Sequence, residues 1–439
     1  MDYGDDGPWR HGSDIRFHKG ANIRGGHMKK RIVRTIVLVA TLDTKGLAIG
    51  YIQDKIRAQG HETIVIDAGI LDKPEVKADI SREEVAKAGG TSLEELLIRA
   101  QKTSDRMQII QVMIEGAAQT VKKLYDQGKV DGLLSVGGSM GTAIGVGAMK
   151  NLPLGIPKLM VATHFYPQAL VGESDLTVMQ CPADIMGLNP VINFTFAQAA
   201  SAICAMAEVK REGKKVRPLV AMTGLGVTTP AVMKLQKLFE PMGYDNVVFH
   251  GNSEVMDQLV EDGVIDGILD FSPQELLRIF VVKEWPWRKS RLESAGRKGL
   301  PQVLVPGSLD MIVLRVAKDN LPAPYKNRKI YMHGPFITAI RTNVEELNQV
   351  AEIMADKMNR AAGPAAVVFP LRGFSAIDKE GFAFYDPETN KSFLRALKEK
   401  LKREVEIIEV DAHILDDDFV KEVARVYDKM AKRTIIRQG

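Results

Sequence analysis

The chain has 439 residues, and its 59 basic and 55 acidic side chains give a formal net charge of +4. All of that excess lies in residues 28–34, because residues 1–27 balance four basic side chains against four acidic ones. The remaining body carries no net charge, which argues against a protein that neutralises many phosphates of a nucleic acid. We therefore expect no nucleic-acid partner.

Cysteine content and hydropathy favour a protein of the cytoplasm. The two cysteines, Cys181 and Cys204, are too few for a disulfide framework, and their spacing matches no metal motif. No apolar run approaches the roughly 20 residues that span a bilayer. The polar N-terminus lacks the apolar centre of a signal peptide. We expect a cytoplasmic protein with no membrane partner.

Residues 1–27 differ from the rest of the chain. They are polar and rich in glycine, they show no hydrophobic period, and they contain three of the eight histidines. Uneven spacing makes these histidines a poor metal site. We interpret 1–27 as a disordered leader or tag and exclude it from the fold.

From Thr35 onward, a unit of strand, glycine-containing turn and helix occurs in both halves of the chain. Four segments match in the same order: 35–40 with 219–223, 63–67 with 246–250, 129–135 with 264–270, and 156–161 with 300–305. Strands that alternate with helices predict parallel sheets with helices on both faces. The right-handed crossover rule then gives two doubly wound, Rossmann-like α/β domains, with a ligand cleft expected between them.

The domain limits follow from composition. Residues 28–208 are predicted to form the N-terminal domain and 216–439 the C-terminal domain, joined by the charged segment 210–215. The N-terminal domain carries a helical insertion, with a capping box at Ser81 and Glu84 and more helix from Leu93 to about Tyr125. The C-terminal third adds strands at 365–370 and 405–410 and helices near 345–360 and 416–432.

The turns that follow the strands combine glycine with hydroxyl side chains. Ligands bind beyond the carboxyl ends of the strands in open parallel sheets, so these turns are the natural place for a site. Glycine lets an anion approach the backbone, and serine or threonine adds a short donor, which together suit a phosphate at a helix N-terminus. Ordinary turns with Ser or Thr caps remain the alternative.

The cofactor-binding candidates come from five such turns. They are Asp43, Thr44, Lys45, Gly137, Gly138, Ser139, Gly141, Thr142, Gly226, Thr228, Thr229, Gly307, Ser308 and Arg372. The turn at 137–142 (GGSMGT) is the strongest, because it places three glycines and two hydroxyls at one helix start.

Known nucleotide signatures are missing from these turns. The sequence has no G-x-x-x-x-G-K-[ST] run, and the turn at 224–229 lacks the third glycine of a dinucleotide fingerprint. Lys45 is a cation in these turns that could neutralise a phosphate or carboxylate. Asp43 and Asp310 could hold Mg²⁺ through a phosphate, although capping is the commoner role of an aspartate after a strand.

Catalytic residues are not defined by the sequence. His164, His250, His333 and His413 follow strands or lie near their ends, and each is a candidate acid, base or ligand. Arg372, between a strand and a glycine, could present its planar guanidinium to an anion or form a surface salt bridge. We take His250, His333 and Arg372 as the catalytic candidates.

Seven motifs in this order resemble the family of the N-terminal domain of the tomato mosaic virus resistance protein and its bacterial, archaeal and fungal relatives. The motifs lie at 40–46 (ATLDTKG), 79–84 (DISREE), 137–142 (GGSMGT), 226–230 (GVTTP), 306–311 (PGSLDM), 370–375 (PLRGFS) and 411–413 (DAH). The resemblance implies a two-domain α/β protein that binds ATP and forms a homodimer. Plant relatives continue into a barrel domain absent from this chain, so a separate barrel-domain partner is an expectation.

Three hypotheses follow. The first is a cytoplasmic protein that binds ATP, with or without Mg²⁺, in a cleft between the domains, where the triphosphate contacts the turns at 137–142 and 226–229. The second is a lyase, isomerase or hydrolase acting on a small carboxylated or phosphorylated metabolite, held by Arg372 and Lys45. The third is a sensor or scaffold without chemistry.

Overall fold

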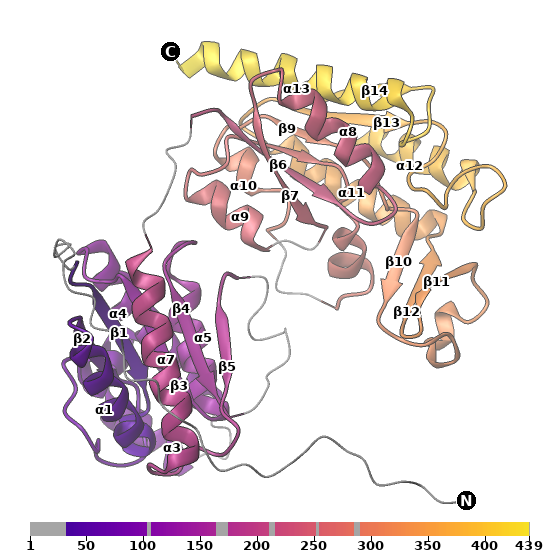
Figure 1. The fold of residues 1–439 in the computed structure, drawn as a ribbon. Helices are drawn as coiled ribbons and strands as arrows, with labels where there is room; N and C mark the ends of the chain where they lie inside the picture. Colours follow the sequence, from indigo (N-terminus) through magenta and orange to yellow (C-terminus); the bar gives the residue numbers. More distant parts are fainter. Residues whose placement is uncertain are drawn as a thin grey trace, which may run out of the picture.

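The computed structural model describes residues 32–102, 107–163, 174–209, 216–251, 254–284 and 290–438. The predicted leader at 1–27, the linker at 210–215 and His164 lie outside the described residues. Two parallel sheets, each covered by helices on both faces, form the two halves of the chain (Figure 1). The predicted class of two Rossmann-like α/β domains is confirmed.

The first sheet is parallel throughout and has the strand order β2-β1-β3-β4-β5. Its strands are β1 (Thr35–Ala40), β2 (Glu62–Asp67), β3 (Gly132–Gly137), β4 (Lys158–Ala162) and β5 (Thr177–Gln180). Strand β1 is apolar without alternation because both of its faces are buried. Val37 and Val39 contact one core cluster, whereas Ile36 and Leu38 contact the other.

Helices cover both faces of the first sheet. Helices α1 (Leu42–Ala58) and α7 (Pro190–Glu208) cover one face, and α2 (Arg82–Ala88), α3 (Leu93–Lys102), α4 (Met107–Asp126) and α5 (Ser139–Lys150) cover the other. The predicted capping box of α2 is present, with Ser81 and Glu84 each accepting the other's backbone amide.

Within the described part of the chain, one helix, α7, is long and apolar enough to cross a membrane. Its side chains Ile192, Phe196 and Ile203 are buried in the core cluster formed with α1 and the sheet. A core helix that buries its apolar face against a sheet can have the same length and hydropathy as a membrane-spanning helix.

The second sheet repeats the strand order of the first. Its parallel strands are β6 (Leu219–Gly224), β7 (Asp245–His250), β8 (Gly267–Asp270), β9 (Gln302–Leu304), β13 (Ala365–Pro370) and β14 (Glu406–Val410), in the order β14-β13-β9-β8-β6-β7. The run β7-β6-β8-β9 corresponds to β2-β1-β3-β4. The four segment pairs matched in the sequence therefore occupy the same places in their sheets.

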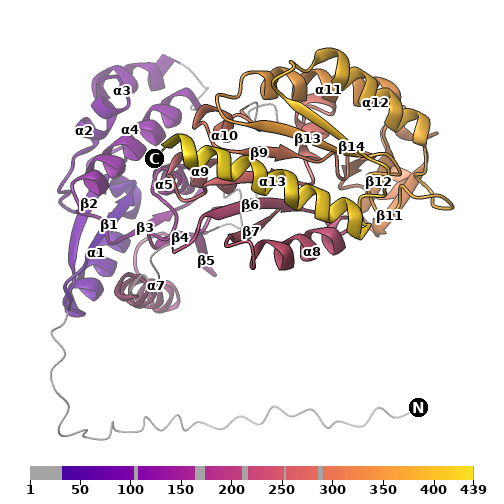
Figure 2. The ribbon, with the colours of Figure 1, turned by 90° about the horizontal axis from the view of Figure 1, so that it is seen from above.

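Helices again cover both faces of this sheet. One face packs against α8 (Thr229–Phe239) and α13 (Asp417–Gln438), which crosses the sheet in Figure 2. The other packs against α9 (Glu254–Glu261), α10 (Ser294–Arg297), α11 (Val344–Asn359) and α12 (Pro387–Lys400). Single turns of other helix types lie at Leu277–Val281 (η1), Lys318–Asn320 (η2) and Ala323–Tyr325 (η3).

A small antiparallel sheet was not predicted from the sequence. It has the order β10-β12-β11, with β10 (Met311–Leu314), β11 (Ile330–Gly334) and β12 (Ile337–Arg341). The turn at 306–310 therefore leads into a strand, so the helix start that we expected after it is wrong.

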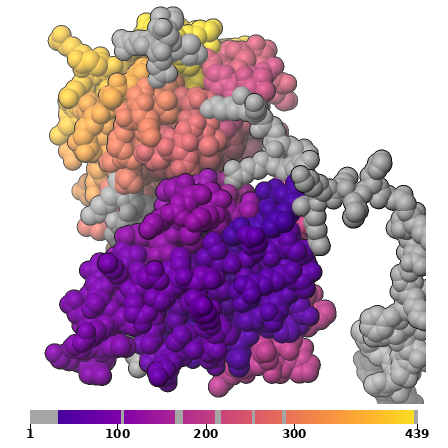
Figure 3. Space-filling model, turned by 90° about the vertical axis from the view of Figure 1, so that its left-hand side faces the viewer, coloured from indigo at the N-terminus to yellow at the C-terminus, as the bar shows by residue number. Residues whose placement is uncertain are grey.

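The two domains meet near the amino end of β4. A cavity of about 90 Å³ there is lined by Lys150, Leu152 and Lys158 of the first domain and by Val255 and Gln258 of the second. The space-filling view shows the first domain below the second (Figure 3). Because Lys158 begins β4, the carboxyl ends of the first sheet lie at the edge away from this contact.

Candidate functional site

A cavity of about 370 Å³ lies at the carboxyl ends of β1 and β3. Six of the predicted cofactor-binding residues line it: Asp43, Thr44, Lys45, Gly138, Ser139 and Gly141. Its apolar wall consists of Ala68, Ile70, Leu71, Ile110, Met113, Met140 and Ile144. The volume is within the range of small-molecule sites, and all lining residues belong to the first domain.

The start of α5 contributes Gly138, Ser139, Met140 and Gly141 to the lining of this cavity. Gly138 is the N-cap, no side chain caps the helix, and no acidic residue lies in its first turn. The first helical amide to find an intrahelical partner belongs to Thr142, which donates to the Gly138 carbonyl at 2.8 Å. The amides before it and the positive end of the helix dipole favour an anion.

Glycine has different roles at three positions of this turn. A Cβ at Gly137 would lie 2.4 Å from the Gly141 carbonyl carbon and the Thr142 nitrogen, so Gly137 is required for the tight path from β3 into α5. A Cβ at Gly138 would come no closer than 3.8 Å to Thr163 Oγ1, and one at Gly141 would lie 3.8 Å from Thr41 Oγ1. Gly138 and Gly141 thus keep the space between hydroxyls open.

Helix α1 supplies hydroxyls and a cation on the opposite side. Thr41 Oγ1 and Thr44 Oγ1 are 3.0 Å apart. Lys45 lines the cavity while its Nζ donates to the Ile185 carbonyl at 2.9 Å. The Lys45 ammonium group is therefore held by the β5–α7 connection.

The acid at the end of β2 is used inside the fold. Asp67 Oδ1 accepts from the Leu42 amide at 3.1 Å and from the Gly69 amide at 2.8 Å. Burial raises the pKa of Asp67, and the two amide hydrogen bonds oppose that shift. Asp67 thus caps the start of α1, and it does not line the cavity.

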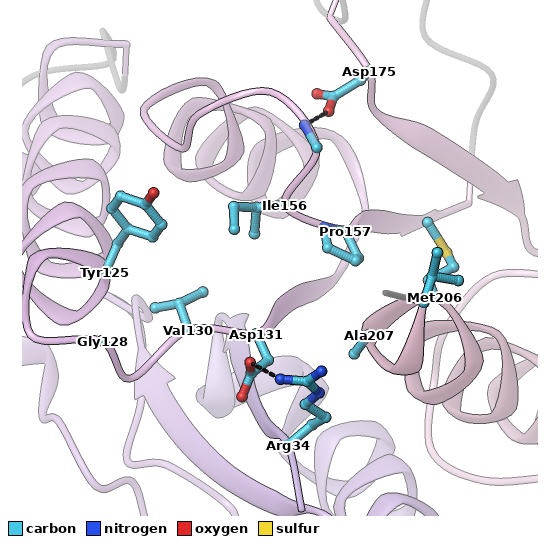
Figure 4. Close-up of a pocket in the computed structure, with 12 residues that line it drawn as sticks. Arg34, Tyr125, Gly128, Val130, Asp131, Ile156, Pro157, Asp175, Met206 and Ala207 are labelled. Carbon is cyan, nitrogen blue, oxygen red and sulfur yellow. Dashed lines mark hydrogen bonds and ion pairs between the residues drawn. The ribbon is translucent and has the colours of Figure 1, made fainter. Parts of the chain in front are cut away.

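A second cavity, of about 890 Å³, lies at the opposite edge of the first sheet (Figure 4). Its charged groups already have partners: Arg34 Nη1 lies 3.1 Å from Asp131 Oδ1, and Asp175 binds the Gly155 amide and Lys158. Helices α4, α5 and α7 end at this edge, where carbonyl dipoles disfavour an anion. The smaller cavity is the better anion site.

The candidates of the second domain do not line the first-domain cavity. Gly226 and Thr229 are exposed, and Thr229 Oγ1 donates to the Leu225 carbonyl at 2.9 Å. Thr228 is fully buried, with its hydroxyl 2.6 Å from Ser272 Oγ. The sequence analysis placed the 226–229 and 137–142 turns on one triphosphate, whereas the residues that line this cavity all belong to the first domain.

The loop after β9 is also closed. A Cβ on Gly307 would lie 2.1 Å from the Phe271 carbonyl oxygen, so that glycine is required by packing. Ser308 is fully buried at φ 60°, a conformation uncommon for a residue with a side chain. Its amide donates to the Phe374 carbonyl at 3.0 Å, which ties the loop to the end of β13.

Buried carboxylates continue this closed region. Ser375 Oγ donates to Asp310 Oδ2 at 2.7 Å. Burial, followed by the charge of Asp378, raises the pKa of Asp310 to about 7. Arg291 is fully buried between Asp270, at 2.5 Å, and Glu275.

Thr142, in the first domain, is also structural, since its hydroxyl donates to the Gly137 carbonyl at 3.3 Å.

The catalytic candidates lie on separate elements. Arg372 is exposed and forms two hydrogen bonds with Asp411, at 2.8 and 2.9 Å, which is the surface salt bridge considered as its alternative. His250 ends β7, and partial burial together with Arg315 lowers its pKa. His333 lies in β11 of the small antiparallel sheet, with its ring 5.1 Å from Tyr331. The geometry does not assemble them into one site.

Family models account for almost the whole described chain. The model of the "Uncharacterised protein family (UPF0261) N-terminal domain" matches residues 34–212, and that of the C-terminal domain matches residues 217–431. The chain belongs to the UPF0261 family.

Relatives match over most of this UPF0261 chain. A UPF0261 protein of Clostridium tetani is 36% identical over 407 residues, covering 91% of this chain and all of the relative. One of Brucella suis is 30% identical over 92% of this chain and 97% of its own length. The ToMV resistance protein Tm-1(GCR237) of Solanum lycopersicum is 32% identical over 67% of this chain and 41% of its own length. These matches confirm the family resemblance.

Several residues of the UPF0261 site escaped the sequence analysis. Ile110 and Met113 line the cavity from α4, in the helical insertion, and amphipathic helix spacing marks them only as core residues. Asp67 was read as a strand end, although a polar residue that closes an apolar strand is itself a signal.

Proposed function

We propose that this protein binds a nucleotide, with ATP as the expected ligand, in the cavity at the carboxyl ends of β1 and β3. The observation that carries the proposal is the uncapped start of α5 beside the hydroxyls of Thr41, Thr44 and Ser139. Backbone amides, hydroxyls and a helix dipole form a neutral site that suits phosphate.

The other end of the cavity suits a planar ring. Ile70 and Leu71 follow β2, Ile110 and Met113 come from α4, and Ile144 comes from α5. These side chains form an apolar surface against which a nucleobase can pack. A ligand with a phosphate tail and a flat apolar head therefore matches the two ends.

Magnesium would enter with the phosphates. Asp43 is the acidic residue among those that line the cavity, and no group of three or more His, Cys, Asp or Glu suited to a metal occurs within the described residues. Mg²⁺ is commonly held by one or two carboxylates together with substrate phosphates and water.

Calorimetric titration with adenosine, AMP, ADP and ATP tests this proposal. We expect affinity to rise along the series, because each phosphate adds contacts with the α5 amides and neighbouring hydroxyls. Equal affinity for adenosine and ATP would contradict the phosphate site. Absence of binding at millimolar ATP would contradict the proposed function as a whole.

A further inference from the structure

Helix α1 begins without a side-chain cap from its own N-cap residue. That residue is Thr41, and a threonine at an N-cap normally accepts a hydrogen bond from an amide of the first helical turn. Within the described part of the chain, the Thr41 side chain makes no such bond. Its Oγ1 lies 3.0 Å from Thr44 Oγ1 instead. The start of α1 therefore relies on another group to hold its first amide.

Asp67 holds that amide from the neighbouring strand. It ends β2, is 1% exposed, and lies opposite Ala40, the last residue of β1. Its Oδ1 accepts from the amide of Leu42, the first residue of α1, at 3.1 Å. Because Leu42 directly follows Thr41, this bond fixes the backbone that carries the Thr41 hydroxyl.

The same oxygen also fixes a second part of the cavity lining. Asp67 Oδ1 accepts from the Gly69 amide at 2.8 Å. Gly69 lies between Ala68 and Ile70, and these two residues line the cavity together with Leu71. One buried acceptor therefore ties the β1–α1 turn to the loop that follows β2.

The Thr41 hydroxyl lies beside the helix start that we propose to bind phosphate. Thr41 lines the cavity, and a Cβ at Gly141 would lie 3.8 Å from Thr41 Oγ1. Gly141 is in the first turn of α5, whose N-cap makes no side-chain hydrogen bond. Binding groups work only when they are held within about 0.5 Å of their productive positions. The backbone that carries Thr41 must therefore be held firmly relative to α5.

We propose that Asp67 is a positioning residue of the nucleotide site, which holds the Thr41 hydroxyl in place for the phosphates without touching the ligand. Asp67 does not line the cavity, so it acts through the Leu42 and Gly69 amides. In dinucleotide-binding folds, by contrast, an acid after the second strand binds the ribose directly. This inference rests on the proposed nucleotide site.

A double-mutant cycle of Asp67→Ala and Thr41→Val tests this role. Asp67→Ala removes the shared acceptor, and Thr41→Val replaces the hydroxyl with a methyl group. Calorimetric titration with ATP and with adenosine, which has no phosphate, measures binding to each variant. Thermal melting and circular dichroism separate loss of fold from loss of binding. The matched control is Thr228→Val, which removes the buried hydroxyl of the N-cap residue of α8 in the second domain.

The two losses should not add. Thr41→Val weakens ATP binding about tenfold and leaves adenosine binding unchanged, because one hydrogen bond to a charged group is lost. Asp67→Ala weakens ATP binding at least as much, because the hydroxyl loses its position. The double variant binds ATP no more weakly than Asp67→Ala, since the group that Thr41→Val removes no longer reaches the phosphate.

Two further variants separate positioning from general stability. Asp67→Asn keeps a carbonyl that can accept both amides, so it should retain most of the ATP affinity. Thr228→Val should lower the melting temperature, because it removes a hydroxyl that lies 2.6 Å from Ser272 Oγ. Its ATP affinity should equal that of wild type.

Several results would overturn the inference. Additive losses in the double variant would show that Thr41 acts independently of Asp67, and wild-type ATP affinity in a folded Asp67→Ala protein would show that no positioning is needed. If Asp67→Ala does not fold, unchanged ATP affinity in Thr41→Val, or a loss in Asp67→Asn as large as in Thr41→Val, would overturn it equally. In each case wild type still binds ATP, whereas failure of the proposed function would show as no binding to wild type.

Discussion

The carboxyl edges of the two sheets have the same strand order and opposite states. At the first edge, an uncapped helix start and several hydroxyls surround a cavity of about 370 Å³. At the second edge, side chains bond to one another: Thr223 to Asp270 at 2.7 Å, Thr228 to Ser272 at 2.6 Å, and Ser375 to Asp310 at 2.7 Å. A repeated strand and turn pattern predicts the edge of a site, whereas an uncapped helix start beside a cavity distinguishes the edge that can take a ligand.

Removing Arg291 should have the largest effect on stability. That effect should be confined to the carboxyl edge of the second sheet. Arg291→Met leaves the buried carboxylates of Asp270 and Glu275 without their cation. Breaking a buried pair in this way costs about 3–5 kcal/mol of stability. Urea or thermal unfolding should show that loss, and retention of full stability would show that the second edge does not depend on its internal ion pairs.

Asp310 should make the stability of the second sheet's carboxyl edge depend on pH. Its folded pKa of about 7 exceeds its ordinary value of 3.8, so folding favours the protonated form. Stability from this group is fully present below about pH 4 and is lost as pH rises through 7. Melting temperatures of wild type and Asp310→Asn, measured from pH 5 to 8, should differ by an amount that changes across this window. A constant difference would contradict a buried, protonated Asp310.

Arg372→Ala should have the smallest effect of these substitutions. The side chain is exposed and paired with Asp411 on the surface, and such solvent-screened pairs contribute little to stability. Unfolding and ATP titration should both stay close to wild type. A large loss of ligand affinity would restore Arg372 as a binding residue and would blur the contrast between the edges.

Much of the fold follows from the sequence because its signals are local. Apolar runs such as 35–40 and 365–370 coincide with β1 and β13, and Ser81 with Glu84 marks the start of α2. The small antiparallel sheet escaped because β10, with four residues, follows a Gly-Ser turn that resembles a helix start.

The site was predictable in part for the same reason. Glycines and hydroxyls after β1 and β3 identified six residues of the cavity. Closure of the second edge was not predictable, because Ser375 and Asp310 are 65 residues apart in the sequence. Such distant side-chain bonds leave no trace in a strand and turn pattern.

The central claim is that the open edge of the first sheet holds the nucleotide, and matched glycine substitutions test it most directly. A Cβ at Gly141 would lie 3.5 Å from the Val136 carbonyl oxygen and 3.8 Å from Thr41 Oγ1, which is ordinary contact. A Cβ at Gly226 would meet no atom within 4 Å. Both alanine variants should therefore fold, as thermal melting would verify.

Calorimetric titration of ATP into wild type, Gly141→Ala and Gly226→Ala then decides between the edges. We predict that Gly141→Ala weakens ATP binding about tenfold or more, because its methyl group would occupy space beside Thr41 that the phosphate needs in order to reach the α5 amides. Gly226→Ala should bind like wild type. Unchanged affinity in Gly141→Ala, or a loss in Gly226→Ala alone, would contradict the assignment of the nucleotide to the first domain.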